Sequence, residues 1–264
     1  MADYSTSAIT LRRIPYGDYD LVLTLLTPDH GKVSVFARSA KKDARRFSGA
    51  TEPFSVLKVL FRSGRGKLPT LAEAALVDPL PTLRADLHKA AYASYWSELV
   101  CAGSEEGAPQ PAVYGLLHDA LTALDRDALG KTALNVFFLS KFAGLSGFFP
   151  ELTCCRSCRI PLDDNAPPVV AVDIASGGMV CERCLSSLPR PCRISKGTIK
   201  ALLWLGTADI QKASRIRFTP ASLEEAVRFL EAFISHHLGH QARSLAFLTH
   251  IRSRREEGRT HHVG

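Results

Sequence analysis

Short runs of apolar residues, each ended by a turn signal, fill the first 78 positions of the chain. Leu, Val, Ile, Phe and Thr dominate these runs, and such composition over six to ten residues is typical of β-strands. Clusters of glycine with proline, serine or aspartate separate the runs. Five strands so close together predict a small closed or partly open barrel. The expected strands are residues 7–13, 20–27, 32–38, 54–61 and 68–77.

After Asp78-Pro79-Leu80-Pro81 the apolar positions recur every three or four residues, which is the spacing of a helix. We expect Thr82 to cap the first helix. In the last helix, Ser222 and Glu225 have the spacing of a capping box, and Gly239 can end the helix. The expected helices are residues 83–103, 112–125, 131–145, 196–205 and 222–238.

These patterns predict an α+β protein with several domains. Residues 1–80 are expected to form an OB-fold β-barrel that binds DNA, because this barrel is the commonest nucleic-acid-binding type of its size. An α-helical domain follows in two parts, residues 81–148 and 193–240, around an inserted loop at 149–192 that is rich in Cys, Pro and Asp. Residues 241–264 are expected to be a basic, disordered tail.

The composition limits where the protein works. The 264 residues are 46% hydrophobic, which is enough for one large core or two small ones. The N-terminal residues lack the pattern of a secretory signal, and no apolar run reaches the roughly 18 residues of a membrane helix. We therefore expect a cytoplasmic protein with no membrane partner, which would be nucleoid-associated if its partner is DNA.

Positive charge is concentrated in the predicted barrel. The formal net charge is +7, and the segment from Lys32 to Lys67 holds ten basic residues against only Asp43 and Glu52. This balance favours a polyanionic partner such as nucleic acid, although a merely solvated loop would show a similar run of charge. The candidate phosphate contacts are Lys32, Arg38, Lys41, Lys42, Arg45, Arg46, Arg62, Arg65 and Lys67.

Two Cys-x-x-Cys pairs, Cys155/Cys158 and Cys181/Cys184, lie 22 residues apart in a chain with seven cysteines. Each pair has the spacing with which a tight turn presents two thiolates to one tetrahedral zinc ion, so we expect one structural zinc. A redox dithiol, or cysteines that hold no metal, are the alternatives. Cys154 fits the spacing less well and is taken as a non-ligand.

The sequence favours no enzyme class. Four thiolates would close the coordination shell of zinc and leave no open position for a catalytic water. His236, His237 and His240 cluster at the end of the last helix, where a role at the helix dipole is the simpler explanation than a metal site. We therefore predict no catalytic residues.

In the order of its motifs the chain resembles the bacterial recombination mediator family RecO. The resemblance is carried by LRRIPYGDYDLVLTLLTPDHGKVSVFARSAKK, the SGATEPF turn, the RGKLPTLAEAALVDPLPTLRADLHKAAYASYWSELV passage, and FFPELTCCRSC followed by GGMVCERC. It covers residues 6–235. The chain departs from the family pattern at Ser39, where the family often has Gly, and at Thr51, where an apolar residue is usual.

The resemblance implies an N-terminal OB-fold, a helical domain with a structural zinc, and a non-catalytic activity. That activity is binding to single- and double-stranded DNA, annealing of complementary strands, and help in loading recombinase onto DNA coated with single-strand-binding protein. Implied partners are DNA, RecR, single-strand-binding protein and, indirectly, the recombinase filament. The alternative function is a zinc-containing protein–protein adaptor of the repair machinery, with only incidental DNA binding. A hydrolase with a hidden catalytic zinc is a third, disfavoured reading.

Overall fold

The computed structural model describes residues 3–42, 47, 49–63, 67–162, 167–185 and 191–260, with side chains in the last range up to Ser253. The chain divides into two compact units. Unit 1 comprises Met1–Arg126 together with Ala242–Gly264, and unit 2 comprises Asp127–Gln241. The division therefore falls inside the predicted helical region rather than at the end of the barrel.

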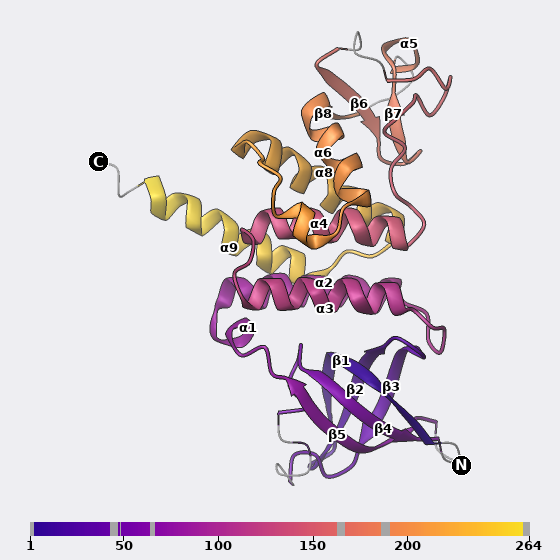
Figure 1. The fold of residues 1–264 in the computed structure, drawn as a ribbon, viewed down its shortest axis with the longest axis vertical. Coiled ribbons are helices and arrows are strands. Elements are labelled where there is room, and N and C mark those ends of the chain that lie inside the picture. Colours follow the sequence, from indigo (N-terminus) through magenta and orange to yellow (C-terminus); the bar gives the residue numbers. More distant parts are fainter. Residues whose placement is uncertain are drawn as a thin grey trace. The chain divides into compact units, whose positions relative to one another are not determined.

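Unit 1 begins with a closed barrel of five strands in the order β1-β2-β3-β5-β4, the arrangement of an OB-like fold, which confirms the expected fold class (Figure 1). All neighbouring strands are antiparallel except β3 and β5, which pair in parallel and close the barrel. The strands are β1 (Asp3–Tyr16), β2 (Asp20–Thr27), β3 (Gly31–Ala37), β4 (Val56–Arg62) and β5 (Thr70–Asp78).

Strand β1 is long and has an irregular register, and it pairs with a different strand along each of its halves. Its first half, up to Ile9, pairs with β4, and its second half, from Ile9, pairs with β2. The register shifts between Thr10 and Arg12, as expected where a bulge bends a strand around a barrel corner. The interior is filled by alternate residues of the strands, among them Leu21, Leu23, Leu25, Val35, Leu57 and Leu71.

Four helices complete unit 1: α1 (Thr82–Ala85), α2 (Leu87–Gly103), α3 (Pro111–Asp125) and α9 (Arg243–Thr260). Helix α2 packs against α3 and α9, and it buries Tyr95 and Trp96. The expected Thr82 cap is wrong, because the helix breaks at Asp86. The Asp86 carboxylate accepts hydrogen bonds from the backbone nitrogens of His88 and Lys89 and so caps α2 instead.

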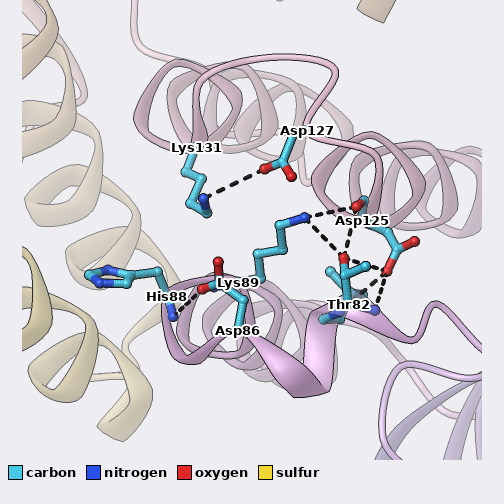
Figure 2. A network of polar contacts seen from close by, with 8 residues as sticks. Thr82, Asp86, His88, Lys89, Asp125, Asp127 and Lys131 are labelled. Carbon is cyan, nitrogen blue, oxygen red and sulfur yellow. Dashed lines mark hydrogen bonds and ion pairs between the residues drawn. The ribbon is translucent and has the colours of Figure 1, made fainter.

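A network of polar contacts ties the start of the helical segment to the end of α3 (Figure 2). The Lys89 side chain is only 3% exposed, and its ammonium donates to the Thr82 hydroxyl at 2.9 Å and to the main-chain oxygen of Asp125 at 2.8 Å. The Asp125 carboxylate accepts from the backbone nitrogens of Thr82 and Leu83. The network thus fixes the chain where it leaves the barrel.

The expected disordered tail contains a helix in the structure. Backbone nitrogens of Arg243 and Ser244 donate to the Glu98 carboxylate at 3.0 and 2.9 Å, which satisfies the first turn of α9. Leu248 and Ile251 are buried. The apolar residues of α9 all lie in its first half, up to Ile251, and this half packs on α2, which also supplies the carboxylate that caps it.

Unit 2 combines helices with a small antiparallel sheet in the order β7-β6-β8. Its core contains Phe138, Phe142, Phe229 and Phe233, which α4 and α8 contribute. The elements are α4 (Lys131–Leu145), β6 (Val169–Asp173), β7 (Gly178–Val180), α5 (Glu182–Leu185), β8 (Cys192–Ser195), α6 (Lys196–Thr207), α7 (Ile210–Ala213) and α8 (Pro220–Leu238).

The expected capping box of α8 is also wrong. Thr219 is the cap, and its hydroxyl accepts from the backbone nitrogen of Ser222. Glu225 instead reaches β8 and α6, where its carboxylate accepts from the backbone nitrogen of Ser195 at 2.9 Å and from the Thr198 hydroxyl. Gly239 ends the helix in a left-handed conformation with φ +61°, as its position predicts.

Candidate metal centre and nucleic-acid interface

The first cysteine pair lies in a tight turn whose backbone is closed by its own hydrogen bonds. The backbone nitrogen of Cys155 donates to the oxygen of Ile160 at 2.8 Å, and that of Arg159 donates to the oxygen of Cys155 at 2.9 Å. Arg159 has φ +63°, which turns the chain just after Cys158. The turn therefore aims both sulfurs of the pair in one direction.

Strand β7 brings the second pair to the first. The backbone nitrogen of Arg156 donates to the oxygen of Met179 at 2.8 Å, which aligns the turn with the strand, and Cys181 follows directly after β7. The backbone nitrogen of Cys181 lies 3.4 Å from the Cys155 sulfur. Cys184 follows in the first turn of α5, where its nitrogen donates to the Cys181 oxygen.

The four sulfurs of Cys155, Cys158, Cys181 and Cys184 all lie within 4.8 Å of one another, with Cys158 and Cys181 3.5 Å apart. Four thiolates around a zinc ion with bonds of about 2.3 Å would be separated by about 3.8 Å in a regular tetrahedron. The cluster therefore has the donor set and the spacing for one metal ion. Among the described residues it is the only group of this kind.

The surroundings of the four sulfurs affect their protonation in different ways. Burial opposes ionisation of Cys155, but hydrogen bonds from the backbone nitrogens of Cys158, Cys181 and Ser157 outweigh it and lower the pKa of its thiol to about 6. The neighbouring thiols of Cys181 and Cys158 raise the pKa of Cys184 to about 12. A bound cation favours the thiolate form of every sulfur that it contacts, so metal binding would also deprotonate Cys184.

The remaining cysteines and the clustered histidines lie outside this group. Cys154 sits in an isolated bridge with Pro161, and burial raises the pKa of the Cys192 thiol. The ring of His237 packs on Phe233, with ring centroids 4.3 Å apart, and its Nε2 contacts the oxygen of Ile174 at 2.8 Å. A packed ring that is engaged by the backbone is a structural histidine.

The candidate phosphate contacts on the barrel fall into three groups. Arg38, Lys41, Lys42 and Lys67 are exposed. The ammonium of Lys32 donates to the main-chain oxygen of Cys101 at 2.8 Å, and Arg62 forms an exposed ion pair with Asp3 at 3.2 Å. Arg45, Arg46 and Arg65 lie outside the described residues. The first group is thus the most available to a phosphate.

The loop after β3 is held against the turn between β1 and β2. Lys41 donates from its backbone nitrogen to the oxygen of Tyr19 at 2.9 Å and from its ammonium to the oxygen of Gly17 at 2.8 Å. Ser39 adopts φ +56°, a conformation that favours glycine, which is the residue the family often has there. In the sequence the β1–β2 turn is visible only as a break between strands, and no local pattern indicates its contact with the loop after β3.

The fold and the cysteine cluster together define a class: an OB-like closed barrel followed by helices that carry a four-cysteine, metal-type loop. Comparison with known proteins narrows this class. The model of the family "Recombination protein O N terminal" matches residues 1–80, and that of "Recombination protein O C terminal" matches residues 84–246. The chain belongs to the RecO family.

Full-length relatives support the same assignment. The chain is 38% identical to the DNA repair protein RecO of Desulfosudis oleivorans, over 96% of this chain and 99% of the relative. It is 36% identical to that of Desulfatibacillum aliphaticivorans, again over 96% and 99%, and 35% identical to that of Myxococcus xanthus, over 95% and 99%. In the part of the chain that the structure describes, no helix combines the length and apolarity needed to cross a membrane.

Proposed function

We propose that this chain is a DNA-binding recombination mediator in DNA repair. It binds single- and double-stranded DNA, anneals complementary strands and helps load recombinase onto DNA coated with single-strand-binding protein. Family membership over the whole chain supports this proposal, since its relatives are called DNA repair proteins. RecR and single-strand-binding protein are the partners that the family implies.

The observation that carries the proposal is the exposed, cationic loop on a closed OB-like barrel. Arg38, Lys41 and Lys42 project from one loop, and the backbone bond from Lys41 to Tyr19 fixes that loop to the neighbouring turn. Cations held on a rigid surface neutralise phosphates and release counterions. When two strands are neutralised together their repulsion falls, and annealing then proceeds by base pairing without any covalent step.

The four-cysteine cluster has a structural role in this proposal. Cys155, Cys158, Cys181 and Cys184 would hold one zinc ion, which closes the coordination shell and leaves no site for a reactive water. The loop around them has few buried apolar residues, so the metal would supply the free energy that folds it. The family is generally a non-catalytic one, in agreement with this role.

The test is a fluorescence annealing assay with complementary oligonucleotides across a salt series, on protein of known zinc content. Annealing should be fast at low salt and decay as salt rises. Reversing two loop charges with Lys41→Glu and Lys42→Glu should weaken single-strand binding and reduce the slope of log K against log salt by roughly 1.4, which corresponds to two lost phosphate contacts. Reversing the exposed Arg215 and Arg217 in unit 2 is the matched control, which should change neither property.

One observation favours a second function, that of a protein–protein adaptor. An apolar pocket of about 320 Å³ opens beside the metal loop, lined by Ile160, Val170 and Met179 among others, with Arg183 and Arg193 at its edge. Such a pocket suits an apolar side chain of a partner protein. Folded, zinc-loaded protein that fails to anneal DNA but forms a salt-insensitive complex with a repair protein would replace the mediator proposal with this one.

A further inference from the structure

Large aromatic side chains are exposed on the outside of the barrel, where the cationic loop meets the β1–β2 turn. Tyr16 is 60% exposed, Tyr19 is 56% exposed and Ile14 is 39% exposed. They are the exposed large apolar residues of β1, β2 and the turn that joins these strands. A cluster of this kind on a barrel face marks a binding surface more often than a chance exposure.

The strand register puts Ile14 and Tyr16 on one face of the barrel, and Tyr19 follows in the turn that joins β1 to β2. Ile14 lies opposite Val22, and Val22 lies opposite Phe36, so the three side chains form a row across β1, β2 and β3. Tyr16 is two residues beyond Ile14 and shares its face. The ring of Tyr16 meets the ring of Phe36 edge-on, with centroids 5.5 Å apart and an interplanar angle of 85°. The partner residues on either side, such as Leu21 and Leu23, point into the barrel core.

Packing holds the exposed rings in place. The edge contact with Phe36 restrains Tyr16 but leaves most of its surface open. The ammonium of Lys42 lies 5.5 Å from the centroid of the Tyr19 ring, and the backbone nitrogen of Lys41 donates to the oxygen of Tyr19. These contacts restrain both rings while their faces stay exposed. A restrained ring loses less conformational entropy when a flat ligand stacks on it.

The charge around the rings suits an anionic ligand. Lys41 and Lys42 contact the β1–β2 turn that carries Tyr19, and the exposed Arg38 precedes Ser39, whose backbone nitrogen bonds to Asp20 at the end of that turn. Two carboxylates lie in the same turn. Asp20 is committed to the backbone nitrogen of Ser39, which it binds at 2.6 Å, and Asp18 is exposed. A surface with open aromatic rings and a surplus of cations combines the two features that bind unpaired nucleic-acid strands.

We infer that Tyr16 and Tyr19 form a stacking platform for the unpaired bases of single-stranded DNA, while Arg38, Lys41 and Lys42 contact its phosphates. This inference rests on the proposed DNA-binding function and adds a preference to it. In a duplex the base faces are hidden by stacking, so the rings can contribute only to binding of a single strand. The cations contact phosphates in single-stranded and in duplex DNA alike. The platform thus gives the barrel a preference for single strands.

The experiment compares binding of the full-length protein to a labelled oligodeoxythymidylate and to a duplex of the same length, across a salt series. The test variant carries Tyr16→Leu and Tyr19→Leu, which keep apolar bulk but remove the π faces. A second variant carries Tyr16→Phe and Tyr19→Phe, which keep the rings. Phe247→Leu, an exposed aromatic change in α9, is the matched control. Melting temperature and zinc content report whether each variant is folded.

The leucine pair should bind the single strand about 10-fold or more weakly, with duplex affinity and the salt slope unchanged. The phenylalanine pair and Phe247→Leu should bind like the native protein. Equal losses for single strand and duplex, or no loss for either, would overturn the stacking platform while leaving DNA binding intact. Native protein that binds neither DNA form would overturn the proposed function itself. A native dimer that the leucine pair converts to monomer, with unchanged single-strand affinity, would reassign the rings to a protein interface.

Discussion

The ammonium of Lys89, in α2, donates to the main-chain oxygen of Asp125 at the end of α3, at 2.8 Å. The two residues are 36 positions apart in the chain. With the Thr82 hydroxyl they close a buried polar network next to the segment that leaves the barrel. A nearly buried ammonium is costly unless it donates hydrogen bonds, so these two bonds tie Lys89 to Thr82 and to the end of α3.

Lys89→Met should therefore destabilise the protein by about 1–3 kcal/mol, since the side chain keeps its length but loses the hydrogen bonds of a charged donor to Thr82 and Asp125. Chemical denaturation monitored by circular dichroism measures the loss. Lys58→Met, at an exposed position of β4, is the control and should change the free energy of unfolding by less than about 0.5 kcal/mol. Equal effects of the two substitutions would show that the network adds nothing.

Two adjacent cysteines provide a sharp test of the metal ligands. Cys155→Ser should abolish binding of the one zinc ion proposed for this site, whereas Cys154→Ser should retain it, because Cys154 lies outside the four-sulfur group. Elemental analysis of purified protein gives the zinc content directly. Zinc should also be released as the pH falls, since protons compete with the metal for the thiolates. Retention of zinc by Cys155→Ser would remove this residue from the ligand set.

Lys32 and Lys41 were expected to act alike, but the structure gives them different surroundings. Each ammonium donates to a main-chain oxygen at 2.8 Å, but the bond from Lys32 to Cys101 in α2 is partly buried, whereas the bond from Lys41 to Gly17 is exposed. We expect Lys32→Met to lower the melting temperature and leave the salt dependence of DNA binding unchanged. Lys41→Met should leave the melting temperature unchanged and reduce the salt dependence of DNA binding. If Lys32→Met instead reduces the salt dependence of DNA binding, Lys32 contacts a phosphate after all.

Glu225 makes stability depend on pH in unit 2. Burial raises the pKa of its carboxyl, but the hydroxyl of Thr198 and the backbone and hydroxyl donors of Ser195 outweigh burial and lower the pKa below its ordinary value of 4.5. A lowered folded-state pKa stabilises the fold above pH 4.5, and this contribution is lost as the pH falls through 4.5 toward the folded value. Thermal unfolding between pH 3 and pH 7 should therefore show a shallower acid decline for Glu225→Gln. The neighbouring Glu224→Gln should decline like the native protein.

Local patterns in the sequence determined much of the fold. The strands of the barrel follow from short runs rich in Leu, Val, Ile, Phe and Thr that end at turn signals, and residues of these runs such as Leu21, Leu23 and Leu25 fill the core. The cysteine cluster was predicted because each Cys-x-x-Cys pair presents two ligands from one turn. Both signals are carried by residues close together in the chain.

Tertiary structure decided the features whose partners lie far apart. Helix α9 is ordered because Ser244 bonds Glu98, 146 positions away, and its own sequence gives little sign of this. The role of Lys32 depends on Cys101, 69 positions away. Tyr16 and Phe36 meet only because β1, β2 and β3 pair in one register. In each case a polar or aromatic side chain contacts a residue that is distant in the sequence, so no pattern among neighbouring residues predicts the contact.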